Sequence, residues 1–171
     1  MQMTMPSTHP LRNGGFTLVE LVITIIVIGI LSAVVLPSMN TLAQHSVTLQ
    51  ADELRRNLSH AQLISISQGQ RLRLNVNAAG TNYTVTSCSD ATCTTPAAVT
   101  DPATGANFSI DLKDGVTFSS GANSNLDLDS LGRPQLAGTL IAAPLTYTLS
   151  GSGRNVSVSV LPITGFAETF Y

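Results

Sequence analysis

The stretch that decides the fold is residues 14–36, which reads GGFTLVELVITIIVIGILSAVVL. From Phe16 to Leu36 its charged side chain is that of Glu20, and its other polar side chains are those of Thr17, Thr24 and Ser32. At a rise of about 1.5 Å per residue, this run just spans a hydrocarbon core of about 30 Å. The pattern therefore predicts a transmembrane helix.

Glu20 is an expensive residue in such a helix. A carboxylate inside a membrane span costs about 2.5 to 3.5 kcal/mol on insertion scales, so it points to a function and to a partner. A cut between Gly15 and Phe16 would create a positive amino terminus four residues before Glu20, available to the same subunit or to a neighbour. The alternative is a signal anchor that tolerates one acid near its end.

The order of the segments differs from that of a secretory signal, in which a small-residue cleavage site follows the apolar segment. Here Gly15 precedes the apolar run, Phe16 follows the candidate cut, and Thr-Leu-Val-Glu leads on toward Pro37. This pattern resembles the type IV prepilin signal. The resemblance implies that a prepilin peptidase removes the leader, residues 1–15, and methylates the amino group of Phe16. It also implies that Glu20 is the assembly glutamate and that Pro37 kinks the helix.

Composition and charge fit one modest domain behind this helix. The chain has 171 residues, with 8 basic and 10 acidic side chains, and Arg12 would leave with the leader. About 100 residues remain beyond the helical part, a normal size for one core. The acidic balance lacks the basic footprint of phosphate binding, so DNA is not expected as a partner.

The helical pattern continues beyond Pro37 as an amphipathic segment, residues 38–69. Apolar residues recur there at spacings of three and four, which predicts one stripe that packs on another layer. Gly69 is the expected stop, because glycine readily adopts the left-handed conformation at a helix end. The stripe consists of Ala43, Val47, Ala51, Leu54, Leu58, Ala61 and Ile64.

From residue 70 to residue 171 the period changes to two, which is typical of strands with one buried face. Six strands are expected, separated by turn-rich linkers, and the stretch from Ser87 to Asn107 is expected to be a surface loop. The fold class is therefore α+β, with a long amino-terminal helix packed on antiparallel sheet. The strands are centred on Leu72–Val76, Tyr83–Val85, Val116–Phe118, Leu126–Leu128, Leu145–Leu149 and Val156–Val160.

Few residues beyond the helix suggest specific chemistry. Cys88 and Cys93 lie in a polar segment of a domain expected to be exported, which favours a disulfide over a metal pair. Arg71 and Arg73 alternate with apolar residues on a predicted strand, so they either contact a partner or form a solvated face. Neither a metal site nor a cofactor is expected, and no catalytic pattern is present in the sequence, so the protein is not expected to be an enzyme.

Three further stretches resemble the GspH/FimT group of prepilin-like proteins. They are residues 51–62 with the basic strand that follows, the turn from Asp129 to Pro134, and the last strand with Thr164 and Gly165. Some members that bind DNA carry basic residues after that glycine. Here Gly165 is followed by Phe166, Ala167 and Glu168, so that activity does not transfer.

The resemblance implies a minor pilin that joins or primes a type IV pilus. Its expected partners are other pilins through their amino-terminal helices, the prepilin peptidase, the inner-membrane assembly platform and membrane lipid. We expect a single-pass inner-membrane protein with a periplasmic domain, which then enters the fibre. Two alternatives stay open: a type II secretion pseudopilin, and a DNA-uptake or adhesive module at the pilus tip. The sequence also leaves open the copy number of the subunit and which of Met1, Met3 and Met5 is the start of translation.

Overall fold

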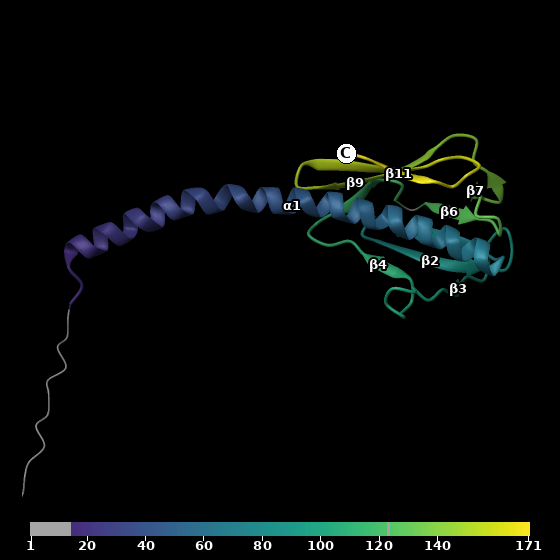
Figure 1. The fold of residues 1–171 in the computed structure, drawn as a ribbon, viewed down its shortest axis with the longest axis horizontal. Helices are drawn as coiled ribbons and strands as arrows, with labels where there is room; N and C mark the ends of the chain where they lie inside the picture. Colours follow the sequence, from purple (N-terminus) through teal and green to yellow (C-terminus); the bar gives the residue numbers. More distant parts are fainter. Residues whose placement is uncertain (1–14, 123) are drawn as a thin grey trace, which may run out of the picture. The chain divides into compact units, whose positions relative to one another are not determined.

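A computed structural model describes residues 15–122 and 124–171, except for the side chains of residues 33–43. Over these residues the chain forms one helix and eleven strands, labelled in chain order in Figure 1. The residues group into two compact units, Met1–Met39 and Asn40–Tyr171. The amphipathic part of the helix therefore belongs to the same unit as the strands.

The helix, α1, runs from Leu18 to Gln68. It ends as expected at Gly69, whose φ of 63° is left-handed, and the Gln70 N–H donates to the Ser65 carbonyl at 3.2 Å in a Schellman-type cap. The backbone is helical through Pro37, so the residue does not locally melt the helix. A kink at Pro37 stays a prediction.

The first sheet is antiparallel and has the order β3-β2-β1-β6-β7-β8, with β4 paired to β2. Its central strand β1 pairs with β2 on one side and with β6 on the other, although β6 lies some fifty residues further along the chain. The strands are β1 (Arg71–Val76), β2 (Asn82–Cys88), β3 (Ala97–Ala98), β4 (Ser109–Asp111), β6 (Asn125–Leu128), β7 (Pro134–Leu136) and β8 (Thr139–Leu140).

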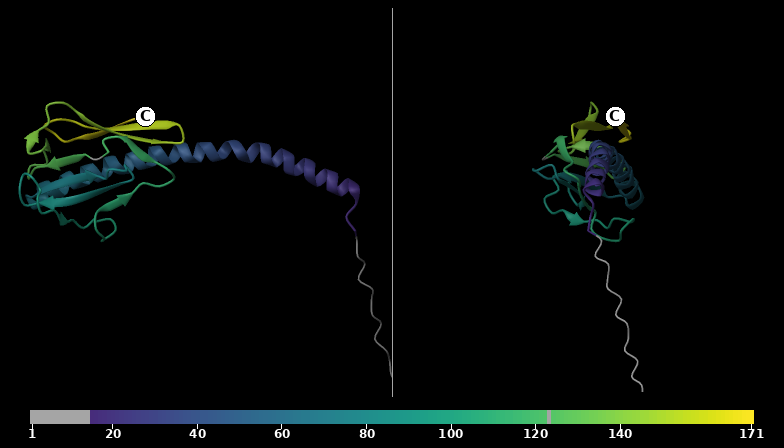
Figure 2. Two further views of the ribbon diagram at one scale, coloured as in Figure 1. Left: turned by 180° about the vertical axis from the view of Figure 1, so that it is seen from behind. Right: turned by 90° about the vertical axis from the view of Figure 1, so that its left-hand side faces the viewer.

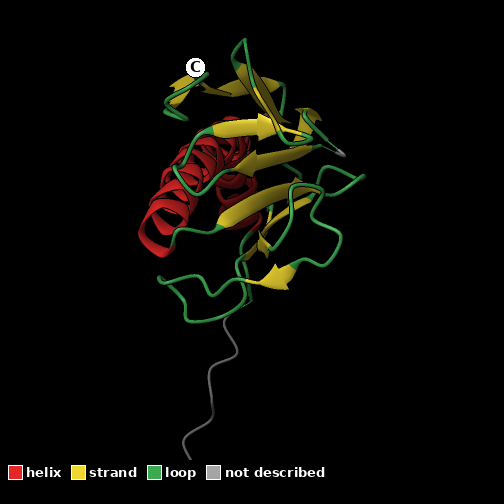
Figure 3. Ribbon diagram, turned by 90° about the vertical axis from the view of Figure 1, so that its right-hand side faces the viewer, coloured by secondary structure: helices red, strands yellow, loops and turns green. Residues whose placement is uncertain are grey.

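The second sheet has the order β11-β10-β9-β5 and is also antiparallel. Figure 3 shows the strands of the two sheets beside the red helix. On the edge strand β11, Ala167 is only 1% exposed, whereas Phe170 at its end is 56% exposed. The strands are β5 (Thr117–Ser120), β9 (Leu145–Gly151), β10 (Arg154–Val160) and β11 (Ala167–Phe170).

The core lies between the apolar stripe of α1 and both sheets. Figure 2 shows the second half of the helix, which carries this stripe, running along the strands. The predicted stripe is buried from Val47 to Ile64, while Ala43 lies outside the described side chains. The rings of Tyr83, Phe118 and Tyr147 meet edge to face at centroid distances of 6.1 and 6.0 Å. Asn57 of the helix donates to the Tyr83 hydroxyl at 2.7 Å, which fixes the helix against β2.

The α+β architecture predicted from sequence is confirmed, and strands occur at all six expected places, namely β1, β2, β5, β6, β9 and β10. Five short strands were not predicted: β3, β4, β7, β8 and β11. The stretch from Ser87 to Asn107 is largely irregular, as expected, with β3 and one isolated bridge between Thr100 and Asn107.

Candidate functional site

The first turn of α1 contains the assembly glutamate of the sequence prediction. Thr17 caps the helix, since its hydroxyl accepts a hydrogen bond from the Glu20 N–H at 3.2 Å. Glu20 also follows Thr17 by three residues, the spacing of a capping box. Its side chain is exposed, and its negative charge lies at the positive end of the helix dipole. Sequence reasoning missed this role of Thr17, although the Thr-x-x-Glu spacing signals it.

The cleavage position lies just before this cap. Gly15 and Phe16 are both exposed, and a Cβ added at Gly15 would meet no atom within 4 Å. The leader before Gly15 lies outside the described residues. Cleavage after Gly15 and methylation of Phe16 stay predictions.

The first half of α1 exposes apolar side chains on every face. The exposed fraction of these side chains runs from 40% at Val22 to 79% at Leu18. Such a surface far exceeds the apolar patches of ordinary monomers, so it requires a covering partner or lipid. The exposed apolar residues of this half are Leu18, Val19, Leu21, Val22, Ile23, Ile25, Ile26, Val27, Ile28, Ile30 and Leu31, and Phe16 just before the helix is exposed as well.

Among the described residues there is no helix whose length and apolar character suffice for crossing a membrane. The segment predicted to span it, residues 16–37, continues past the described side chains, and its place in a membrane stays a prediction.

Arg71 and Arg73 lie on the face of β1 turned away from the helix, as their alternation predicts, but neither is a freely solvated side chain. The Arg73 guanidinium binds the carboxylate of Asp127 through two hydrogen bonds, of 2.6 and 2.9 Å. This hydrogen bonding raises the pKa of Arg73. Arg71 donates to the Gln135 amide oxygen at 2.6 Å. The two arginines therefore join β1 to β6 and β7, which corrects the picture of a solvated face, and contact with a partner subunit stays a prediction.

The loop after β2 is closed by the disulfide between Cys88 and Cys93, as predicted. Within this loop, the Asp90 carboxylate accepts hydrogen bonds from the Thr92 N–H at 2.9 Å and from the Thr94 hydroxyl at 2.6 Å. Hydrogen bonds from the hydroxyls of Thr94 and then of Thr92 lower the pKa of Asp90. Arg73 also donates to the Thr92 carbonyl at 3.2 Å, which fastens the loop to the sheet.

In the turn from Asp129 to Pro134, the Asp129 carboxylate accepts hydrogen bonds from other residues of the same turn. Burial opposes ionisation of Asp129, but hydrogen bonds from the Arg133 N–H and guanidinium and from the Leu131 N–H outweigh it and lower its pKa. No cluster of three or more metal-ligating side chains occurs among the described residues.

Gln62 links the three stretches that carry the GspH/FimT resemblance. From the helix, its amide donates to the Gly132 carbonyl at 2.8 Å and to the Thr164 carbonyl at 2.5 Å. A Cβ added at Gly165 would lie 2.6 Å from this amide nitrogen and 2.8 Å from the Gly132 oxygen. Glycine is thus required there by close approach as well as by its φ of 68°.

Two comparisons with known proteins fit this geometry, whereas no sequence among the curated proteins matches the chain. The model of the prokaryotic N-terminal methylation motif matches residues 11–36. Two structures of the minor pseudopilin EpsH from the type II secretion system of Vibrio cholerae share the fold. One has a TM-score of 0.54 at 14% identity, covering 73% of this chain and 96% of that chain. The other has a TM-score of 0.54 at 13% identity, covering 74% and 97%.

The two matches bear on different parts of the molecule. The methylation motif covers residues 11–36, which include Gly15, Glu20 and the apolar first half of α1, and the structural likeness establishes the fold of the domain. Motif and fold together confirm the resemblance seen in the sequence: residues 11–36 match the prokaryotic N-terminal methylation motif, and the chain shares its fold with a minor pseudopilin.

Proposed function

We propose that this chain is a minor, non-enzymatic subunit of a type IV pilus or of a type II secretion pseudopilus. A prepilin peptidase cuts after Gly15 and methylates Phe16. The mature subunit then waits in the inner membrane as a single-pass protein with its domain in the periplasm, until the assembly platform transfers it to the fibre.

The observation that carries this proposal is the exposed apolar half of α1 with one carboxylate in its capped first turn. Hydrophobic burial against other helices is non-directional, so it supplies attraction but little register. An ion pair between Glu20 and the Phe16 amine of a neighbour supplies register, because an ion pair is stronger in a dry interface than in water. Contacts of this head-to-tail kind generate open filaments.

Substitution of Glu20 tests the proposal. Glu20→Ala should be processed normally but should fail to co-purify with the partner pilins or pseudopilins. Glu53→Ala is a matched control, since it removes a carboxylate from the other half of the same helix and should assemble normally. Assembly of the Glu20→Ala variant at the level of the control would refute the role of Glu20.

Crosslinking distinguishes the two fibres. A photoreactive residue at Val19, beside Glu20 and 64% exposed, should capture the neighbouring subunit, and mass spectrometry would identify that subunit. Capture of pseudopilins assigns the chain to a secretion system, and capture of pilins assigns it to a pilus. The same photoreactive residue at Arg56, in the other half of the helix, is the control site. If the Val19 site captures neither pilins nor pseudopilins above the level of this control, the assembly role is contradicted.

A further inference from the structure

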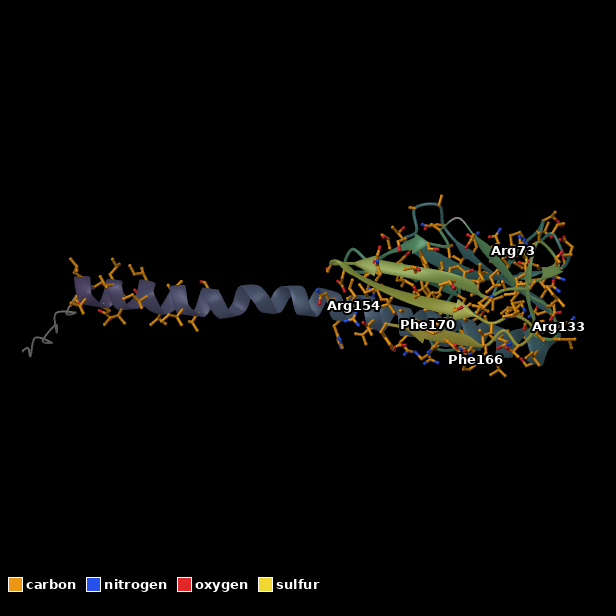
Figure 4. All side chains as sticks on the ribbon, turned by 90° about the horizontal axis from the view of Figure 1, so that it is seen from above. Arg73, Arg133, Arg154, Phe166 and Phe170 are labelled. Carbon is orange, nitrogen blue, oxygen red and sulfur yellow. A yellow bond between two sulfur atoms is a disulfide. The ribbon has the colours of Figure 1, made fainter. Side chains whose placement is uncertain are left out.

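The outer face of the first sheet carries an open pocket of about 300 Å³, with a mixed polar and apolar lining, that the assembly role does not use. Its floor consists of side chains from β1, β2 and β6, and a wall is formed by Cys93 of the disulfide and by Pro96 just after it. The volume lies at the lower end of the range for small-molecule sites, and it suits a ligand about the size of one sugar ring. Figure 4 shows Arg73, which lines this pocket, well apart from the exposed Phe166 and Phe170.

The pocket is built from direct cross-strand neighbours, so its geometry is set before any ligand arrives. Asn75 pairs with Thr84 on one side and with Asn125 on the other, and Arg73 pairs with Thr86. The wall is fixed by the disulfide and by the hydrogen bond from Arg73 to the loop. A rigid site of this kind avoids the entropy cost of ordering its side chains on binding.

Several polar groups in the pocket have hydrogen-bonding capacity left over. Thr84 and Thr86 line the pocket, and each carries a hydroxyl that can both donate and accept. The Asn75 amide nitrogen donates to the Asn125 oxygen, which leaves an oxygen on Asn75 and a nitrogen on Asn125 for a ligand. The pocket therefore offers donors and acceptors side by side.

The charge in the pocket is balanced. Arg73 is its cation, and two hydrogen bonds tie the guanidinium to Asp127, a residue only 1% exposed. The side chain of Arg73 is itself 14% exposed, so its charge is largely compensated within the domain. An anion such as phosphate gains little binding free energy there, because Asp127 already neutralises Arg73. A neutral ligand that both donates and accepts hydrogen bonds matches the groups present.

We propose that this pocket binds a neutral hexose unit of a glycan. The ring hydroxyls meet the hydroxyls of Thr84 and Thr86 and the amides of Asn75 and Asn125, while a C–H face of the ring packs on Pro96 and the disulfide. This role adds a glycan-binding surface to the subunit and does not depend on how the helix assembles.

A titration of the full chain tests the pocket directly. The isotope-labelled protein is held in micelles of a detergent without a sugar headgroup and titrated with glucose, galactose, mannose and N-acetylglucosamine, with inorganic phosphate as the anionic probe. We expect at least one hexose to shift the side-chain amide signals of Asn75 and Asn125 in a saturable way, with a dissociation constant of about 1 mM. Phosphate should leave these signals in place.

Two matched variants separate binding from folding. Thr86→Val keeps the shape and the strand propensity of the residue but removes its hydroxyl, and it should weaken hexose binding about tenfold. Thr146→Val makes the same change on the exposed face of β9 and should bind as the unaltered protein does. Three results would overturn the proposal: no saturable shift with any of the four sugars up to about 50 mM, equal affinity in the two variants, or tighter binding of phosphate than of every hexose.

Discussion

The two halves of α1 contain similar apolar residues but differ in what covers them. In residues 16–32 the large apolar side chains are exposed on all faces, whereas Val47, Ala51 and Leu54 are fully buried along one stripe. A stripe can be covered by two sheets of the same chain, but an apolar surface on every side needs several partners or lipid. The second half of the helix is thus covered by its own chain, whereas the first half needs a cover from outside the chain, either partner helices or lipid.

The largest effect should come from blocking the maturation of the first half. Gly15→Leu places a branched side chain at the position before the cut, and the family resemblance implies that the peptidase then fails to cleave. Mass spectrometry of the protein from cells with an active prepilin peptidase should detect only the uncleaved chain. Gly29→Leu is the control, because a Cβ at Gly29 meets nothing within 4 Å, and it should be cleaved fully. Cleaved protein in the Gly15→Leu variant would contradict the leader assignment.

The comparison between the halves also predicts unequal costs for truncating apolar residues. Leu54→Ala removes a fully buried side chain and should lower the free energy of unfolding of the domain by about 2 to 5 kcal/mol. Ile26→Ala removes a side chain that is 55% exposed and should lower it by less than about 0.5 kcal/mol. Urea denaturation of the full chain in micelles, followed by near-ultraviolet circular dichroism, measures both. Similar losses in the two variants would refute the division of the helix.

The smallest effect concerns the cap of the first half. Thr17→Val removes the hydroxyl that accepts from the Glu20 N–H, which should cost about 1 kcal/mol, confined to the first turn. Amide hydrogen exchange at Glu20 should accelerate about fivefold. Thr24→Val is the control, because the Thr24 hydroxyl donates to the Leu21 carbonyl within the helix and does not cap it. An unchanged exchange rate at Glu20 would show that Thr17 does not cap the turn.

Local pattern in the sequence was enough to predict the helix, its end at Gly69 and six strands, because each of these is encoded by residues close in the chain. Strand β11 was missed because Ala167, Glu168 and Thr169 carry little strand pattern, and Ala167 is buried through the fold around it. The strands β3 and β8 have two residues each and depend on their neighbours.

The contacts around the candidate sites were harder to predict, because they join distant segments. Arg73 faces Asp127 only because β1 pairs with β6 in one particular register. The link from Gln62 to Gly132 and Thr164 likewise needs the helix and two turns to be in place. The disulfide, in contrast, joins cysteines five residues apart and could be predicted.

The contacts between the domain and α1 have a mechanical consequence. The stripe from Val47 to Ile64 and the Gln62 amide hold the helix along most of its length in the domain. A pull along the helix axis acts on all these contacts in shear and loads them together rather than one after another. The helix can therefore bear a load along its axis while the sheets stay folded.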